Sequence, residues 1–314
     1  MPVGTSLQPS SLCPVMQRIT TCCLLMCLLA GGCEETSAPE PEAPAGVSDP
    51  VALQVFEDGH GPPLVMLGGG TDGAAAFAPH ARLLAKDFRV LRLQSLRIER
   101  CQSKQPLPPA YSIKAESAAL AQSLDQLTIG EPVNLVGHSF GALVALDFAL
   151  DNPDRVRTLL LAEPPAFWVV PPEELRADAE MRAMVELVRT FAPADEPTDE
   201  QLVQFQSRLG RGGVKPPAPG QPAWEDWVSK RSVLRGLSAV ANHSDDPVRL
   251  KGLRVPVLIV TGKDTVAFHR RINDILAASL PVVERIELPG GHGAPGTARG
   301  EFVSALRAFL ARHR

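Results

Sequence analysis

The chain has 314 residues, of which 45% are hydrophobic, enough for one large domain or two small ones with a sizeable core. Its formal net charge is -4 at pH 7 and no basic stripe stands out, which argues against nucleic acid as a partner. Five of the six cysteines lie at or before Cys33, so the rest of the chain, with Cys101 as its single thiol, excludes an internal disulfide and a cysteine zinc site.

Residues 1–33 have the pattern of an export signal. An apolar run at 19–30 follows Arg18 and is too short to span a bilayer comfortably, which is typical of the central region of a signal peptide. The run ends in Leu29-Ala-Gly-Gly-Cys33, and small residues before a cysteine resemble the lipobox of bacterial lipoproteins. The resemblance implies that Cys33 is lipidated and anchors the protein to a membrane, at the periplasmic face or the outer membrane of a bacterium. The alternatives are a cleaved signal that leaves a periplasmic or secreted protein, and a poorly ordered tail on a cytosolic enzyme.

A linker is expected between this signal and the rest of the chain. Residues 34–50 are rich in Pro, Ala and Glu and show no periodicity, so they cannot bury enough apolar surface to offset their ordering entropy. They would act as a tether for a domain that spans residues 51–314. Met16 is an alternative start, which would leave residues 1–15 untranslated.

From residue 51 onward, strand and helix patterns alternate. Apolar runs predict strands, and apolar residues at helical spacing predict helices between them. Strands are expected at 51–56, 64–67, 89–93, 133–136, 157–161, 255–260 and 285–288, and helices at 74–86, 114–127, 142–150, 269–280 and about 302–310; a loop is expected at 94–100. The nearly continuous apolar character of most strands predicts an α/β fold with a mostly parallel, twisted sheet and helices on both faces.

The alternation stops between about residues 166 and 245. Helical patterns at 173–191, 199–209 and 223–237 predict a helical insertion over one edge of the sheet. Four aromatic residues of this insertion could line a pocket, although they are as well explained as its own core. They are Phe167, Trp168, Trp224 and Trp227.

The most informative stretch is Gly137-His-Ser-Phe-Gly141, between a buried strand and a helical pattern. Gly-x-Ser-x-Gly in this position is typical of a nucleophile elbow, in which a strained turn lifts the serine hydroxyl clear of the sheet. The glycines are needed because side chains there would clash with the neighbouring strand and helix. Ser139 is therefore the candidate nucleophile. The alternative is a chance turn in which Ser139 only caps the helix.

Three further residues are expected near Ser139. Gly70 and Glu163 follow other predicted strands, and ligands bind at the carboxyl ends of parallel strands. A serine hydroxyl also needs a base within hydrogen-bond reach. His292, in the glycine-bracketed loop Pro289-Gly-Gly-His-Gly293, suits this role because the pKa of histidine lies near ~6.5. His138 is expected to pack behind the nucleophile, and no role is expected for His269.

In their order along the chain, these motifs resemble those of the alpha/beta-hydrolase superfamily, with a helical cap after the sixth family strand. The stretches that carry the resemblance are Leu67-Gly-Gly-Gly70, Gly137-His-Ser-Phe-Gly141, Val257-Leu-Ile-Val-Thr-Gly262 and Leu288-Pro-Gly-Gly-His292. The resemblance implies that Ser139 is the nucleophile, that His292 is the base, and that the backbone N–H groups of Gly70 and Phe140 form the oxyanion hole. Most relatives have His-Gly where this chain has Gly68 and Gly69, which would change how the loop is braced.

The resemblance leaves two candidates for the acid of the triad. Most relatives place Asp three residues after the position of Gly262, and Asp264 lies one residue too early. Other relatives place the acid after the sixth strand, where this chain has Glu163, and we prefer Glu163. Without a catalytic role, Glu163 would be a solvated loop carboxylate and Asp264 a helix cap.

The predicted function is that of a serine hydrolase that cleaves an ester, thioester or related acyl bond of a small molecule through an acyl-enzyme. No cofactor or metal is expected. One alternative is a non-catalytic, lipid-anchored binding protein on the same fold. Others are acyl transfer, cofactor-free haloperoxidase activity or carbon–carbon cleavage by the same triad. The sequence leaves the oligomeric state open.

Overall fold

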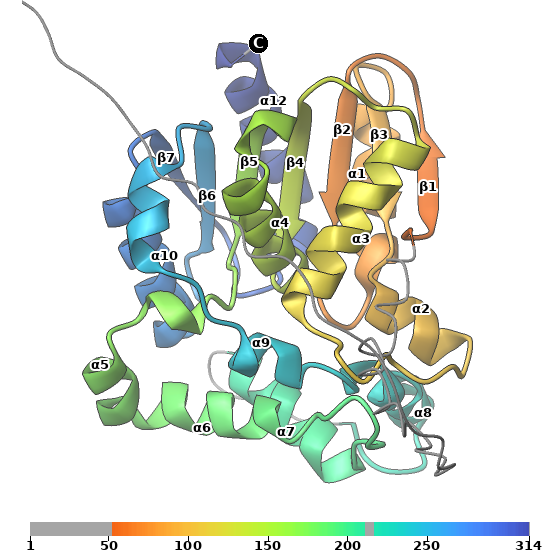
Figure 1. The fold of residues 1–314 in the computed structure, drawn as a ribbon. Coiled ribbons are helices and arrows are strands. Elements are labelled where there is room, and N and C mark those ends of the chain that lie inside the picture. The colour runs from red at the N-terminus through yellow and green to blue at the C-terminus, as the bar shows by residue number, and fades with distance from the viewer. Residues whose placement is uncertain (1–51, 211–216, 314) are drawn as a thin grey trace, which may run out of the picture. The chain divides into compact units, whose positions relative to one another are not determined.

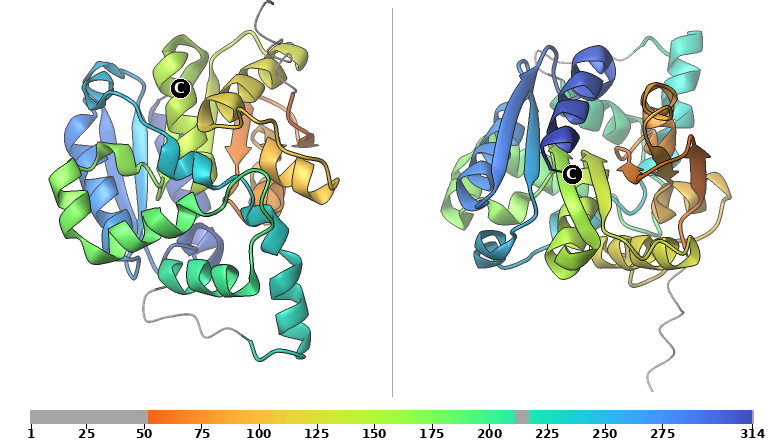
Figure 2. Two further views of the ribbon diagram at one scale, coloured as in Figure 1. Left: turned by 60° about the horizontal axis from the view of Figure 1, so that its bottom comes forward. Right: turned by 90° about the horizontal axis from the view of Figure 1, so that it is seen from above.

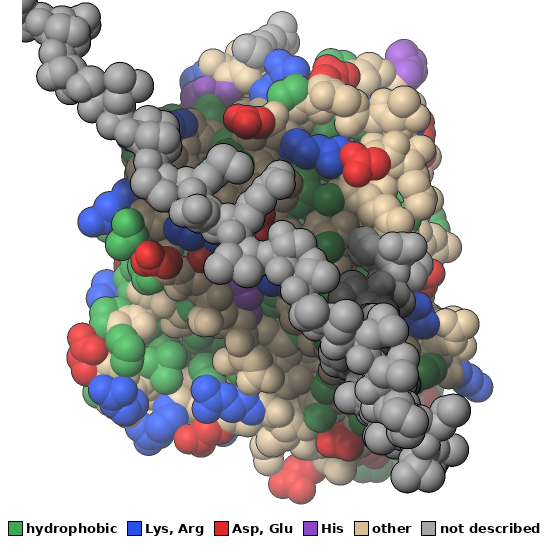
Figure 3. Space-filling model, in the orientation of Figure 1, with side chains coloured by type: hydrophobic (Ala, Val, Ile, Leu, Met, Phe, Trp, Pro, Cys, Tyr) green, Lys and Arg blue, Asp and Glu red, His purple; other side chains and the backbone are tan. Residues whose placement is uncertain are grey.

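The computed structural model describes residues 52–210 and 217–313 (Figure 1). The signal predicted at 1–33, with Cys33, and the linker predicted at 34–50 lie outside the described residues. Within the described residues, no helix is long and apolar enough to cross a membrane. Basic and acidic side chains are interspersed on the face shown in Figure 3, in keeping with the small net charge.

A seven-stranded sheet forms the centre of the domain, in the order β1-β3-β2-β4-β5-β6-β7. Only β1 is antiparallel to its neighbour β3, and the other pairs are parallel, which confirms the predicted fold class. The strands are β1 (Val55–Asp58), β2 (Pro63–Leu67), β3 (Arg89–Leu93), β4 (Val133–His138), β5 (Val156–Ala162), β6 (Val257–Gly262) and β7 (Val283–Leu288).

Each inner strand contributes side chains to two hydrophobic cores, because successive residues of a strand face opposite sides of the sheet. In β2, Leu64 and Met66 join one core, whereas Val65 and Leu67 join the other. Helices α1 (Ala78–Leu84) and α12 (Arg299–Arg312) cover the first face, and α3 (Ile113–Gln126), α4 (Phe140–Asp151) and α10 (Ala267–Ser279) cover the second. In Figure 1, α3, α4 and α10 lie in front of the sheet and α12 lies behind it.

Two predicted elements were wrong because a side chain caps the start of a helix within each of them. The stretch at 94–100 is not a loop but the start of α2 (Leu96–Gln102), and the Ser95 hydroxyl accepts a hydrogen bond from the Ile98 N–H. The helix predicted at 173–191 is two helices, α5 (Pro172–Ala177) and α6 (Ala179–Arg189). Asp178 separates them, since its extended backbone ends α5 and its side chain accepts from the Met181 N–H.

Two further predicted helices are shorter than expected. The stretch at 74–86 begins as a 3-10 turn, η1 (Gly73–Phe77), before α1. The stretch at 223–237 contains α8 (Pro222–Ser229) and η4 (Arg231–Leu234), and Gly236, with a φ of 81°, ends it before α9 (Ser238–Asn242). A positive φ of this kind favours glycine and is incompatible with a continuing helix.

The segment between β5 and β6 forms a helical cap across the carboxyl ends of the strands (Figure 2). It runs through η3 (Phe167–Val169), α5, α6, α7 (Asp199–Leu209), α8, η4, α9 and η5 (Pro247–Gly252). Helix α6 is amphipathic and packs against α7 and α9. Its buried residues include Met184 and Val188, so the cap and the sheet together enclose apolar side chains.

Candidate active site

Ser139 occupies a sharp turn between β4 and α4. Its φ of 51° and ψ of -121° are unusual for a non-glycine residue, and such strain is characteristic of functional positions. A Cβ atom on Gly137 would lie 2.4 Å from Ala142 Cα, and one on Gly141 would lie 2.3 Å from the Leu67 carbonyl oxygen. Both positions therefore require glycine, and the close approach of α4 to β2 and β4 holds the turn.

A continuous chain of hydrogen bonds leads away from the Ser139 hydroxyl. Ser139 Oγ lies 2.9 Å from His292 Nε2, and His292 Nδ1 lies 2.7 Å from Glu163 Oε2. His292 is in the loop between β7 and α11 (Ala294–Thr297), and Glu163 directly follows β5. With Glu163 ionised, Nδ1 carries the proton and Nε2 accepts from the hydroxyl.

The Glu163 carboxylate is buried, with 2% of the residue exposed, yet it is well supplied with donors. Oε1 accepts from the Gly262 N–H at 2.8 Å, and Oε2 accepts from the Thr265 hydroxyl at 2.8 Å. Burial alone would raise the pKa of Glu163, but the hydrogen bond from His292 and the neighbouring histidine rings hold it at about 2. The carboxylate is therefore ionised at neutral pH.

Asp264, the other candidate acid, is exposed on the turn after β6 and lies at the wall of the pocket. Its backbone N–H donates to the Gly290 carbonyl, which ties this turn to the loop that carries His292. Both ring nitrogens of His292 have partners in Ser139 and Glu163. The structure thus brings Glu163, rather than Asp264, to the imidazole.

Two further histidines flank His292: His138, which was expected to pack behind Ser139, and His269, for which no role was expected. The His269 ring stacks on the His292 ring at 4.3 Å between centroids and 13° between planes, and His138 Nε2 lies 2.8 Å from the His292 carbonyl oxygen. Burial lowers the pKa of His138 to about 4 and that of His269 to about 3, so both rings are neutral at neutral pH. They hold the base in place without adding charge beside it.

Three residues of metal-binding types meet here. Glu163, His269 and His292 have possible ligand atoms within 4.8 Å of one another. The two imidazole rings are nearly parallel, however, so their in-plane lone pairs do not converge on one point, and the His292 nitrogens already have partners. The set fits a hydrogen-bonded relay better than a metal site.

The expected oxyanion-hole residues lie beside the nucleophile. Gly70 ends the glycine run after β2, and Phe140 is the first residue of α4. Neither backbone N–H donates a hydrogen bond within the described part of the chain, and both residues line the same pocket as Ser139. Two unpaired N–H groups are thus available next to the Ser139 hydroxyl.

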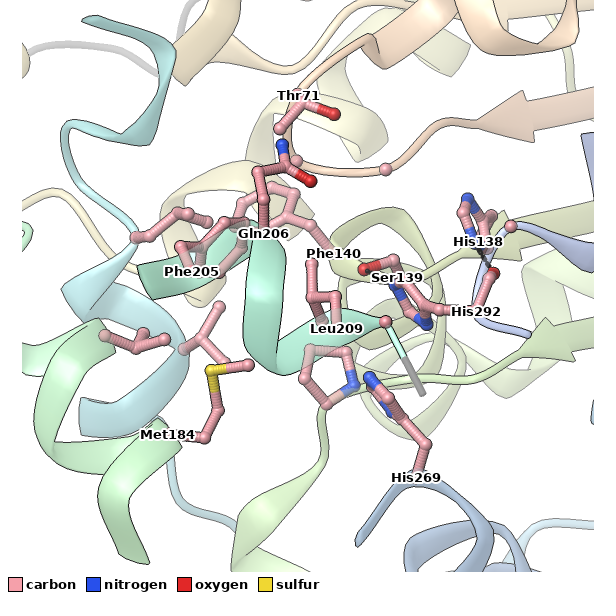
Figure 4. Close-up of a pocket in the computed structure, with 18 of the residues that line it drawn as sticks. Thr71, His138, Ser139, Phe140, Met184, Phe205, Gln206, Leu209, His269 and His292 are labelled. Carbon is pink, nitrogen blue, oxygen red and sulfur yellow. Dashed lines mark hydrogen bonds between the residues drawn. The ribbon is translucent and has the colours of Figure 1, made fainter. Parts of the chain in front are cut away.

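A cavity of about 480 Å³ extends from Ser139 beneath the cap. Figure 4 shows Met184, Phe205 and Leu209 of the cap across from Ser139 and His292, and Gln206 beside Thr71. Most of the lining side chains are apolar: Ala76, Phe140, Pro165, Phe167, Met184, Val188, Phe205, Leu209, Leu237, Val240 and Phe268. Of the four aromatic residues considered from the sequence, Phe167 therefore lines this cavity.

Comparison with known proteins identifies the family. Residues 62–295 match the sequence model of the family described as alpha/beta hydrolase fold. The chain belongs to this family. It is a hydrolase, as the names of its alpha/beta-hydrolase relatives also indicate.

Individual relatives are distant. The chain is 25% identical to a proposed carbamate hydrolase, RutD, of Serratia proteamaculans strain 568, over 79% of this chain and 91% of the relative. It is 27% identical to the protein of the same name in Stutzerimonas stutzeri strain A1501, over 79% of this chain and 92% of that relative. A thermophilic esterase from Thermogutta terrifontis has a similar fold, with a TM-score of 0.64, 22% identity and coverage of 83% of this chain and 94% of that one.

The low pKa of Glu163 predicts a specific pH dependence of stability. A carboxyl whose pKa is lower in the folded protein than in the unfolded chain stabilises the fold above the unfolded-state pKa and loses that contribution as the pH falls through the folded-state pKa. The pKa of Glu163 is lowered from its ordinary value of 4.5 to about 2. As the pH falls across this range, we expect the free energy of unfolding of the wild-type protein to fall by about 3 kcal/mol relative to that of Glu163→Gln. Urea unfolding of both proteins across this range measures the difference, and a constant difference would contradict the prediction.

Proposed function

We propose that the protein is a serine hydrolase that cleaves an ester, thioester or related acyl bond through an acyl-enzyme. The observation that carries the proposal is the hydrogen-bond chain from Ser139 through His292 to Glu163, which begins in a cavity large enough for a small molecule. A nucleophile, a base within reach and a group that orients the base are the parts that such chemistry needs.

In the proposed reaction, Ser139 Oγ attacks the acyl carbon while His292 Nε2 takes the hydroxyl proton. The separation of 2.9 Å permits this transfer without rearrangement. His292 then gives the proton to the leaving group, and an acyl-enzyme remains on Ser139. Water enters, His292 removes its proton, and the same sequence releases the acid and restores the hydroxyl.

The remaining groups orient the imidazole of His292 and stabilise the charges that develop during the reaction. Glu163 accepts the Nδ1–H of His292, which fixes the tautomer and stabilises the imidazolium that forms. The N–H groups of Gly70 and Phe140 would donate to the developing oxyanion, and such a donor is typically worth roughly 3 kcal/mol. Phe140 lies at the N-terminal end of α4, where the helix dipole also favours negative charge.

The lining of the cavity favours an ester with an apolar acyl or alcohol part. Met184, Val188 and Phe205 offer no hydrogen bonds, so a small polar substrate would leave much of its surface unsatisfied there. The names of the RutD relatives make a carbamate the alternative substrate, and the same nucleophile could attack its carbonyl. Acyl transfer, haloperoxidase activity and carbon–carbon cleavage use the same groups and would be separated by product analysis.

The proposal predicts covalent labelling at Ser139. A fluorophosphonate should label the wild-type protein, and Ser139→Ala should abolish labelling and lower the hydrolysis of p-nitrophenyl esters by at least about 10⁴-fold. Ser103→Ala, which removes a surface hydroxyl, is the matched control and should behave as wild type. An unlabelled, inactive but folded wild-type protein would favour the non-catalytic binding protein instead.

The choice of acid predicts different effects at the two carboxylates. Glu163→Gln should lower kcat by about 10³- to 10⁴-fold, because the amide favours the wrong imidazole tautomer. Asp264→Asn should stay within a few-fold of wild type, since it leaves the Glu163–His292 hydrogen bond intact. Steady-state kinetics on an activated ester measures both. The reverse result would transfer the role to Asp264.

We also propose that the enzyme is exported and anchored to a bacterial membrane by a lipid on Cys33. The apolar run and the small residues before Cys33 support this location. Expressed in a bacterium, the wild-type protein should sediment with membranes, whereas Cys33→Ser should not. Cys27→Ser, within the apolar run, is the control and should remain with the membrane. Mass spectrometry of the mature N-terminus would contradict the proposal if it found an unmodified Cys33.

A further inference from the structure

Arg97 is a buried arginine that the proposed reaction does not use. It lies in the first turn of α2 and is fully inaccessible to solvent. Its Nη2 donates to the backbone carbonyl of Gly70, while Nε and Nη1 have no hydrogen-bond partner within the described part of the chain. Burial lowers the pKa of Arg97, and leaving Nε and Nη1 unpaired is costly, although Tyr111, Cys101 and the Glu116 carboxylate nearby favour the charged form.

A second contact of Arg97 points to the same place. Its guanidinium carbon lies 4.9 Å from the centre of the Phe140 ring, in cation–π geometry. Gly70 and Phe140 are the two residues whose N–H groups we assign to the oxyanion hole. One side chain thus touches both residues from the side away from the cavity, which Arg97 does not line.

The position of Arg97 is itself fixed. The Glu116 carboxylate of α3 accepts hydrogen bonds from the backbone N–H groups of Leu96 and Arg97, at 3.0 and 3.1 Å. The Tyr111 hydroxyl donates to the same carboxylate at 2.6 Å. These bonds attach the first turn of α2 to α3, and α3 packs against α4, which carries Phe140.

The glycine run after β2 needs such support. Gly68, Gly69 and Gly70 are consecutive, and glycine backbone has more conformational freedom to lose than any other. A Cβ atom on Gly70 would lie 3.2 Å from Arg97 Nη2, so the guanidinium packs directly against this backbone. Without it, the Gly70 peptide would lose a charged hydrogen-bond donor.

We propose that Arg97 is a positioning residue that holds both oxyanion-hole donors in place, the Gly70 backbone through its carbonyl and Phe140 through its ring. The inference rests on the proposed function, because it concerns the donors of that reaction.

The test compares Arg97→Met and Arg97→Lys with Arg235→Met. Arg235 Nη2 contacts Cys101 of α2 and the Gln105 carbonyl beyond the end of that helix, and makes no hydrogen bond to the glycine run, so Arg235→Met controls for the loss of a nearby arginine. Arg97→Met should lower kcat by about 10- to 100-fold with KM nearly unchanged, and should weaken binding of a trifluoromethyl ketone by the same factor. The kcat and the ketone affinity of Arg97→Lys should lie between those of wild type and Arg97→Met, since one ammonium group cannot reach both Gly70 and Phe140.

Hydrogen exchange of the segment 67–73, in which the Gly73 N–H donates to the Gly69 carbonyl at 3.0 Å, gives a readout that does not need activity. We expect faster exchange in Arg97→Met than in wild type or Arg235→Met. The proposal would be overturned if this segment exchanged in Arg97→Met at the same rate as in wild type. It would also be overturned if Arg97→Met had the same kcat and the same affinity for the ketone as wild type. If Arg97→Met does not fold, Arg97→Lys decides by the same measures. Wild-type protein that neither reacts with fluorophosphonate nor hydrolyses esters would refute the proposed function, and the exchange experiment would still decide whether Arg97 braces the loop.

Discussion

The candidate site depends on the hydrogen bond between the Glu163 carboxylate and His292 Nδ1, which joins residues 129 positions apart in the chain. Strand register makes this bond possible. Gly262 pairs with Leu288, so β6 and β7 end at the same level, whereas Ala162 pairs with Val260, so β5 ends beside β6 just before Gly262. The carboxylate reaches across the end of β6 and takes the Gly262 N–H on the way. A shift of one residue in either pairing would separate the acid from the base.

Ser139 and His292 could be singled out from sequence because their signals are local: a glycine-flanked turn around Ser139 and a glycine-bracketed loop around His292. For the partner of His292 the sequence left two carboxylates, with Glu163 preferred to Asp264, because the choice depends on the register of the strands and on donors such as Thr265. His269 was missed for the same reason. A signal existed, since His269 shares the buried face of α10 with Ile272 and Leu276, where a polar side chain is unexpected.

For the fold as well, features set by the local sequence were predicted better than features set by contacts between distant residues. Apolar runs placed the inner strands to within two residues, because burial in a parallel sheet leaves a nearly continuous hydrophobic pattern. The edge strands β1 and β7 were expected from alternation, and β1 begins at Val55 rather than at residue 51. Helix ends were predicted less well. The apolar stripe continues across Asp178, so periodicity alone joins α5 to α6, although the aspartate is a strong capping residue.

The place of Glu163 in the chain has a mechanical consequence. It is the last residue before Pro164 and Pro165, after which the cap begins at η3. Because proline holds φ near about −65°, the start of the cap is a stiff junction. The far end of the cap, which runs through η5 into β6, contains no residue of the relay. A cap that swings open by bending at that far end would leave the acid undisturbed, whereas bending at the start would pull the carboxylate away from the imidazole.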